Sequence, residues 1–171
     1  FHCLVRPDTR IPPAATAIHG IDDVRVVDAS QFAEVWPKLS DYIGSAIVIG
    51  HTFGFDLAVF KRECERSKIH FDQPRTLDTR LLAQVAQPNL AGYTIEELTA
   101  WLGIEVENRH SALGDAITTA RVFAALVPKL RAVGVRTLAE ATRACGTLTR
   151  VLEEQHRAGW LEGAGELARS D

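Results

Sequence analysis

His110 and Asp115 are the residues whose types and spacing most directly suggest chemistry. They flank four residues in the stretch HSALGDAITTA, where a helix is predicted to begin. Ser111 is a suitable N-cap, because its hydroxyl can accept from a free backbone N–H one turn on. Asp115 falls in the early turns, where the helix dipole favours an anion. A carboxylate fixed beside a histidine can hold a metal ion and move a proton. The alternative is a dipole-compensating acid next to an ordinary loop histidine.

A second acid, Asp56, follows a continuous apolar run. Residues 46–50 read AIVIG, which is typical of a buried strand, and we expect it to pair in parallel. Residues 51–54 follow at its carboxyl end, and a helix is predicted from Phe55 to Ser67. Asp56 therefore lies at a strand-to-helix junction, the place where sites collect in open α/β sheets.

The remaining elements follow from hydrophobic periodicity, breakers and capping signals. We expect an α/β fold, although two strands are too few for a stable sheet. The expected elements are a strand at 1–6, a short helical turn from Pro12 to Ala17, a turn at His19–Gly20, a helix at 30–43 that Pro37 breaks or kinks, a connector with at most a short strand at 69–77, helices at 78–86, 94–102, 110–133 and from 137, and a further amphipathic helix or a tail at 148–162.

Composition sets limits on the class of protein. The chain has 171 residues, 46% hydrophobic and 24% charged, which is ordinary for a soluble domain. The net charge of −3 excludes a broad basic surface, so any contact with nucleic acid should be local or carried by metal ions. The apolar runs are too short for a membrane span and the N-terminus does not resemble a signal peptide. Three cysteines without zinc-like spacing fit a reducing compartment, so we expect a cytoplasmic protein.

The sequence holds no methionine, even at position 1, and Phe1 begins in what reads as a strand already under way. We therefore expect a piece of the protein to precede Phe1. We divide the printed chain into a main domain at 1–134 and a C-terminal helical extension at 135–171.

Two stretches carry a resemblance to a known family: IVIGHTFGFDLAVF, with Asp56, and HSALGDAITTARVF, with His110 and Asp115. Together with ATAIHGIDD and the spacing between the three, they resemble the DEDDh exonucleases. That family includes the proofreading subunit of bacterial DNA polymerase III, oligoribonuclease and ribonuclease T. The resemblance covers about residues 1–130, so it implies that the domain at 1–134 is exonuclease-like and lacks its N-terminal strand motif. It implies an RNase H-like mixed sheet flanked by helices, with the first strands missing from the printed chain.

The resemblance also implies a chemistry. The family uses four carboxylates and a histidine to hold two divalent ions, Mg²⁺ or Mn²⁺, which bracket the attacking and leaving oxygens of a phosphodiester. By resemblance, Asp56 is the third acid and Asp115 the fourth, and both are expected to bind metal. His110 is expected to be the general base, since an imidazole can accept a proton near neutral pH.

The sequence departs from the family at two places. The family's first motif, an Asp and a Glu two residues apart, is absent from the printed chain, and nothing replaces it. If the polypeptide truly began at Phe1, little activity would be expected. The second motif often has Asn after its histidine, where this chain has Thr52. A hydroxyl keeps a hydrogen bond possible but changes its reach.

Four further residues are expected to bind substrate. Ile18 and His19 could line the pocket for the terminal nucleotide, as the family's equivalent loop does, with loop packing as the alternative. His51 could touch phosphate, or could be a strand-end residue that makes a backbone contact; Phe55 completes the set. Asp72 and Asp78 read as turn or cap residues, and the three tryptophans (Trp36, Trp101 and Trp160) read as packing residues.

The leading hypothesis is a metal-dependent 3′–5′ exonuclease that releases nucleotides from single-stranded DNA or RNA 3′ ends. Other domains of the same polypeptide, or a polymerase, are its possible protein partners. One alternative is a non-catalytic, exonuclease-like interaction module of a larger protein. Another is a hydrolase of free nucleotides or short oligonucleotides that uses the same site. The residues ahead of Phe1 and product analysis discriminate among the three.

Overall fold

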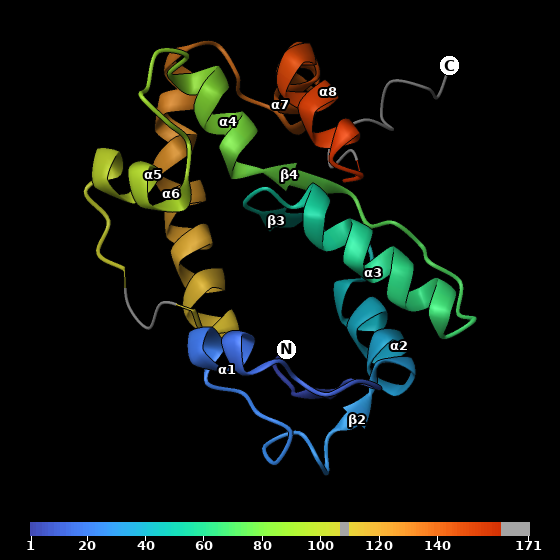
Figure 1. Cartoon of the computed structure of the whole chain (residues 1–171). Helices are drawn as coiled ribbons and strands as arrows, with labels where there is room; N and C mark the ends of the chain where they lie inside the picture. The colour runs from blue at the N-terminus through green and yellow to red at the C-terminus, as the bar shows by residue number, and fades with distance from the viewer. Residues whose placement is uncertain (107–109, 162–171) are drawn as a thin grey trace.

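The chain folds into eight helices and four short strands within the described residues, which are 1–106 and 110–161 of this computed structural model (Figure 1). Within these ranges, no helix combines the length and apolar character needed to cross a membrane. The strands are β1 (Val5–Arg6), β2 (Ser30–Gln31), β3 (Val48–Gly50) and β4 (Thr76–Asp78). The helices are α1 (Pro13–His19), α2 (Phe32–Ile43), α3 (Gly54–Arg66), α4 (Thr79–Ala86), α5 (Ile95–Leu102), α6 (Ala112–Ala132), α7 (Leu138–Gly146) and α8 (Thr149–Arg157).

The described strands form two separate parallel pairs, β1 with β2 and β3 with β4. Each pair is joined by a crossover that contains a helix, α1 or α3, as parallel pairing requires. The α/β class is confirmed, and so is the parallel pairing of the AIVIG run. The short strand that the sequence allows within 69–77 is β4, which extends to Asp78, a residue that the sequence assigns to the next helix. The register places Gly50 opposite Asp78.

Helix ends agree well with the sequence. Ser111, Thr94 and Thr137 each accept the backbone N–H three residues on, at 3.1, 3.3 and 3.2 Å. Gly103 closes α5 in the left-handed conformation, with φ 66°. These caps depend only on neighbours along the chain, which is why the sequence predicts them.

Elements that depend on distant partners differ more. The strand predicted at 1–6 is limited to Val5–Arg6, because β2 offers a ladder of only two residues. The helix α2 continues through Pro37, although proline removes one N–H from the helical ladder. Burial of Val35 and Trp36, 7% and 3% exposed, offsets this loss. The turn expected after Pro12 is a helix that runs to His19.

The main core lies between α4, α5, α6 and α7. Leu82, Leu98, Leu126 and Cys145 come from these four helices, and each is 0% exposed. Burial raises the pKa of the Cys145 thiol to about 12, so this cysteine behaves as an inert core residue. The domain boundary near residue 134 stays a prediction, although α7 shares this core.

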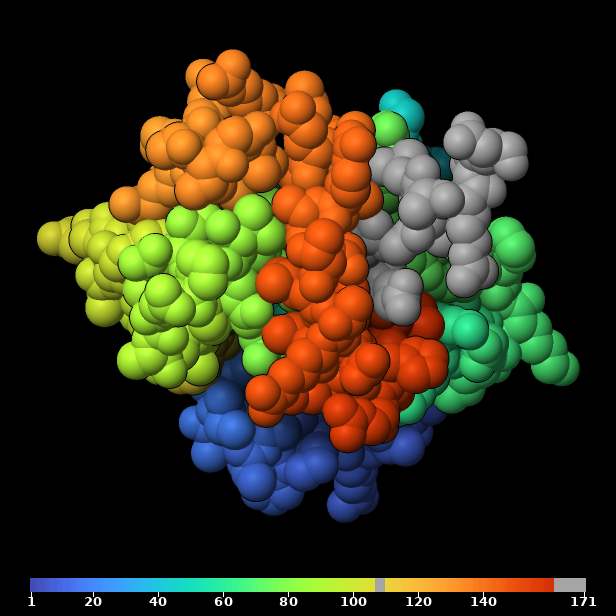
Figure 2. All heavy atoms as spheres, turned by 90° about the horizontal axis from the view of Figure 1, so that it is seen from above, coloured from blue at the N-terminus to red at the C-terminus, as the bar shows by residue number. Residues whose placement is uncertain are grey.

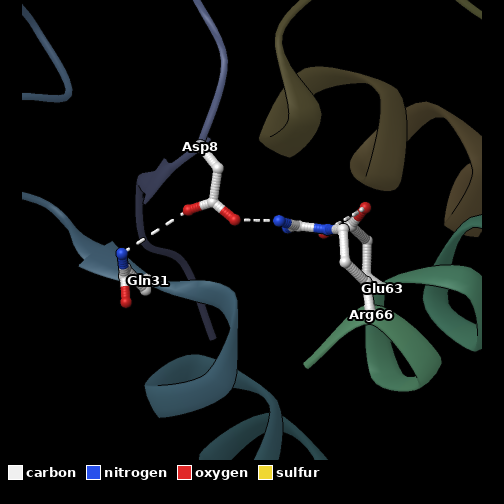
Figure 3. A network of polar contacts seen from close by, with 4 residues as sticks. All are labelled: Asp8, Gln31, Glu63 and Arg66. Carbon is white, nitrogen blue, oxygen red and sulfur yellow. Dashed lines mark hydrogen bonds and ion pairs between the residues drawn. The ribbon is translucent and has the colours of Figure 1, made fainter. Parts of the chain in front are cut away.

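An apolar cavity of about 900 Å³ lies between the N-terminal segment, α1, α2, α3 and α6. Asp8 and Arg66, both among its lining residues, form an ion pair, and Gln31 donates to Asp8 at 3.5 Å (Figure 3). The pair is half-exposed, 52% and 46%, so it contributes little to stability. It links the segment after β1 to α3.

The end of the described chain returns to the start of α3. Figure 2 shows α7 and α8 crossing one face of the molecule beside α4. The last helix ends at Arg157, earlier than predicted, and the chain continues to Leu161, whose N–H donates to the carbonyl of Gly54 at 3.0 Å. Trp160 lies edge-on to Phe55, with ring centroids 6.1 Å apart.

We expect Gly54→Ala to destabilise the protein by about 1–3 kcal/mol, because a close-packed site cannot take an extra methyl group without strain. A Cβ at Gly54 would lie 2.4 Å from the backbone oxygen of Leu161. Urea unfolding measures the change. Gly146→Ala is the matched control, since a Cβ there meets nothing within 4 Å. Equal stability of the two variants would contradict the close packing at Gly54.

Candidate functional site

The junction between β3 and α3 carries the first predicted site residues. β3 ends at Gly50, and the chain turns through Thr52 and Phe53 into α3, with Asp56 in its first turn. Thr52 has φ 57°, in the left-handed region. A β-branched residue in this conformation is strained, at a cost of roughly 1–2 kcal/mol. Other contacts must therefore hold the turn in place.

The carboxylate of Asp78 supplies those contacts. It accepts the backbone N–H groups of Thr52 and Phe53, each at 3.0 Å, and that of Arg80 at 2.8 Å. Asp78 is only 3% exposed. Its interpretation as a cap is confirmed, because the bond to Arg80 is the N-cap of α4. The two bonds to the β3–α3 turn are an additional role.

His51 is half-buried beside this turn and its tautomer follows from its partner. The hydroxyl of Thr79 donates to the carbonyl of Gly50 at 3.1 Å, so it must accept from Nδ1 of His51, 2.9 Å away. In neutral His51, Nδ1 therefore carries the proton and Nε2 holds a lone pair. Burial lowers the pKa of His51, while the charge of Asp78 opposes the shift. The expected phosphate contact of His51 stays a prediction.

Asp56 lies in a setting that disfavours its ionised form. Burial raises the pKa of its carboxyl group above the ordinary value of 3.8. A backbone hydrogen bond opposes this shift, and the negative charge of Asp78 adds to it. A carboxylate held in such a setting is stabilised by any cation brought next to it.

The start of α6 carries the other two residues. Asp115 is exposed in the first turn, and Ser111 caps the helix as predicted. His110, also exposed, precedes the cap with φ 63°, so it too has a left-handed backbone. Histidine tolerates this conformation better than most residues. The structure thus fixes the backbone conformation of His110, which the sequence leaves open.

The apolar cavity is lined by one of the predicted residues, His19, next to residues from the start of α6. His19, at the end of α1, lines the same cavity as Ala112, Leu113 and Ala116 of α6. Ile18 is 64% exposed and Phe55 is 53% exposed, so both side chains are available to a ligand. Binding by these residues stays a prediction.

The described residues do not by themselves complete a metal site. Asp56 and Asp115 are the oxygen donors that hard divalent ions prefer. In residues 1–106 and 110–161, however, no group of three or more His, Cys, Asp or Glu side chains could hold an ion. The two carboxylates lie in the first turns of separate helices, α3 and α6. The ligand set therefore has the right chemistry and too few members.

Sequence reasoning missed the part that Asp78 and Thr79 play at the β3–α3 turn. Both contacts depend on the β3–β4 pairing, which the sequence marks only weakly. A pairing of the two apolar runs in parallel register, with Gly50 opposite Asp78, is the signal that could have found them.

Comparison with known proteins identifies the family. A family model described as "Exonuclease" matches residues 1–123. The chain belongs to the exonuclease family. A DNA polymerase III subunit epsilon-like protein of Rhodobacter capsulatus is 39% identical over 139 residues, 80% of this chain and 20% of that protein. A 3′-5′ exonuclease DinG of Staphylococcus epidermidis is 32% identical over 123 residues, 72% of this chain and 14% of that protein.

These exonuclease relatives are much longer, so the chain spans a fifth or less of the length of the two. A solved structure, exonuclease X in complex with 5′ overhanging duplex DNA, matches with a TM-score of 0.56 and 23% identity. The match covers 83% of this chain and 78% of the exonuclease X chain. This match confirms the RNase H-like fold class.

We expect Asp56→Asn to be more stable than the wild type at pH 7 in chelator-treated buffer. The folded-state pKa of Asp56 is raised, so its ionised form costs stability above that pKa and costs nothing below 3.8. The advantage of the variant should therefore shrink as the pH falls, and vanish below 3.8. Urea unfolding at several pH values measures it, with Asp41→Asn as an exposed control on α2. A variant that is no more stable than the wild type at pH 7, or whose advantage does not shrink as the pH falls, would contradict the raised pKa.

Proposed function

We propose that this exonuclease-family chain belongs to a metal-dependent 3′–5′ exonuclease of the DEDDh type. The observation that carries the proposal is the family match over residues 1–123, which contains both Asp56 and the His110–Asp115 pair. Each of the two acids lies in the first turn of a helix, as the sequence predicts. The relatives with similar sequences include a protein named 3′-5′ exonuclease, which supports the direction of digestion.

In this proposal Asp56 and Asp115 hold divalent ions, Mg²⁺ or Mn²⁺. When bound, such ions would supply positive charge to the phosphate and lower the pKa of a bound water. His110, whose backbone precedes the α6 cap with φ 63°, would accept the proton of the attacking water. The family's Asp-x-Glu pair, which the printed sequence lacks, would supply the further carboxylates.

The substrate that fits best is a single-stranded 3′ end. A net charge of −3 does not suit a long duplex held by its backbone. Ile18, His19, His51 and Phe55 are proposed to contact the last nucleotides, by stacking and by hydrogen bonds to phosphate. We propose a cytoplasmic protein in which further domains of the same polypeptide, or a polymerase, present the substrate.

The protein as its gene encodes it should shorten a 5′-labelled oligonucleotide from the 3′ end in the presence of Mg²⁺ or Mn²⁺. Asp115→Asn should reduce the rate by about 100-fold or more, because it removes a charged metal ligand. Gel analysis of the ladder measures both rates, and Asp41→Asn, an exposed acid on α2, is the control. No shortening by the wild type, or equal shortening by Asp115→Asn, would contradict the proposal.

A second candidate is a non-catalytic module with an exonuclease fold. The observation in its favour is the incomplete ligand set among the described residues. Two measurements separate the candidates: the coding sequence ahead of Phe1, searched for an Asp-x-Glu pair, and a Mn²⁺ titration of the encoded protein. An absent pair together with no Mn²⁺ binding favours the module. Product analysis with mononucleotides and dinucleotides separates a hydrolase of short oligonucleotides.

A further inference from the structure

We propose that Asp78 is a positioning residue, which sets the place of Asp56 at the exonuclease site by fixing the backbone of the β3–α3 turn. The inference rests on the proposed function, because that function gives Asp56 its role. Asp78 itself is not proposed to touch metal or substrate.

The geometry gives Asp78 two separate tasks. Its Oδ1 atom accepts from Thr52 and Arg80, and its Oδ2 atom accepts from Phe53. The bond to Arg80 caps α4, whereas the bonds to Thr52 and Phe53 lead to a different part of the chain. A cap alone needs one oxygen and one N–H, so a helix cap does not explain the other two bonds.

The turn that these bonds hold is strained. Thr52 keeps φ at 57°, which a β-branched residue adopts at a steric penalty. Its own N–H and the next one both point to Asp78. Buried, charge-assisted hydrogen bonds of this kind are among the strongest that a backbone makes. Without these hydrogen bonds, the steric penalty would favour a return of Thr52 to negative φ.

Asp56 follows this turn directly. The carbonyl of Thr52 accepts from Phe55 at 3.2 Å, and that of Phe53 accepts from Leu57 at 3.0 Å, so both belong to the first turn of α3. A change of φ at Thr52 would therefore rotate the helix start and move the Asp56 carboxylate. Thr79, next to Asp78, also bonds to Gly50 and His51, which ties down the other side of the turn.

The test uses Asp78→Ser in the protein as encoded. Serine is as good an N-cap as aspartate, so the α4 cap is retained. Its single, shorter oxygen cannot also reach Thr52 and Phe53. We expect the 3′-shortening rate and the Mn²⁺ affinity to fall by about 10- to 100-fold, the range for groups that orient metal ligands. Asp78→Asn, which keeps one acceptor oxygen, should lose less.

A readout independent of activity is amide hydrogen exchange. Residues 52 and 53 should exchange faster in Asp78→Ser, while α5 keeps its protection. Thr137→Ala, which removes the cap of α7, is the control for a general loss of stability. It should lower the melting temperature without changing the exchange at 52 and 53 or the Mn²⁺ affinity.

Rescue gives the sharpest test. Asparagine adopts the left-handed conformation more readily than threonine. The double variant Thr52→Asn/Asp78→Ser should therefore recover part of the lost affinity and rate, and should slow the exchange at residues 52 and 53. No recovery, or a loss no larger than that of Thr137→Ala at matched stability, overturns the inference.

The two proposals fail in different ways. A wild-type protein that neither shortens oligonucleotides nor binds Mn²⁺ overturns the exonuclease proposal. Unchanged exchange at residues 52 and 53 in Asp78→Ser overturns the positioning inference, whatever the activity.

Discussion

The hydrogen bonds from the β3–α3 turn to the buried Asp78 carboxylate are the constraint on which the candidate site depends. They exist because β3 and β4 pair in parallel with Gly50 opposite Asp78. The pairing itself has only three residue pairs, so it is short for an independent sheet. Its stability comes from α4 and α6, which bury Leu81, Leu82 and Val122 beside it. The packing of the core thus stabilises the candidate site through the end of β4, where Asp78 lies.

The candidate site also shows how electrostatics oppose stability. Asp56 and Asp78 are both acids, and the charge of Asp78 raises the pKa of Asp56. Asp78 is stabilised by three backbone N–H donors, whereas burial disfavours the charge of Asp56. The two neighbouring carboxylates therefore have different roles. Asp78 has its hydrogen-bond partners within the fold, whereas the carboxylate of Asp56 is available to a bound cation.

Much of the fold and part of the candidate site could be predicted from the sequence, for physical reasons that differ between residues. The caps Ser111, Thr94 and Thr137 are local, and the structure confirms each. The parallel strand at 48–50 is confirmed. The sequence predicts it because a continuous β-branched apolar run favours a buried strand. The contacts of Asp78 with Thr52 and Phe53, and the extent of β1, depend on residues more than twenty positions away, which no local pattern encodes. The roles of Asp56, His110 and Asp115 stay predictions.

The left-handed backbone of His110 has a practical consequence for how this residue is studied. Alanine has no special tolerance for positive φ, so replacing His110 by alanine would change the path of the chain as well as remove the ring. The effect measured would combine a lost side chain with a shifted α6 start. Asparagine or glycine keeps the backbone preference and isolates the contribution of the imidazole. The choice of replacement therefore decides what a knock-out at this position reports.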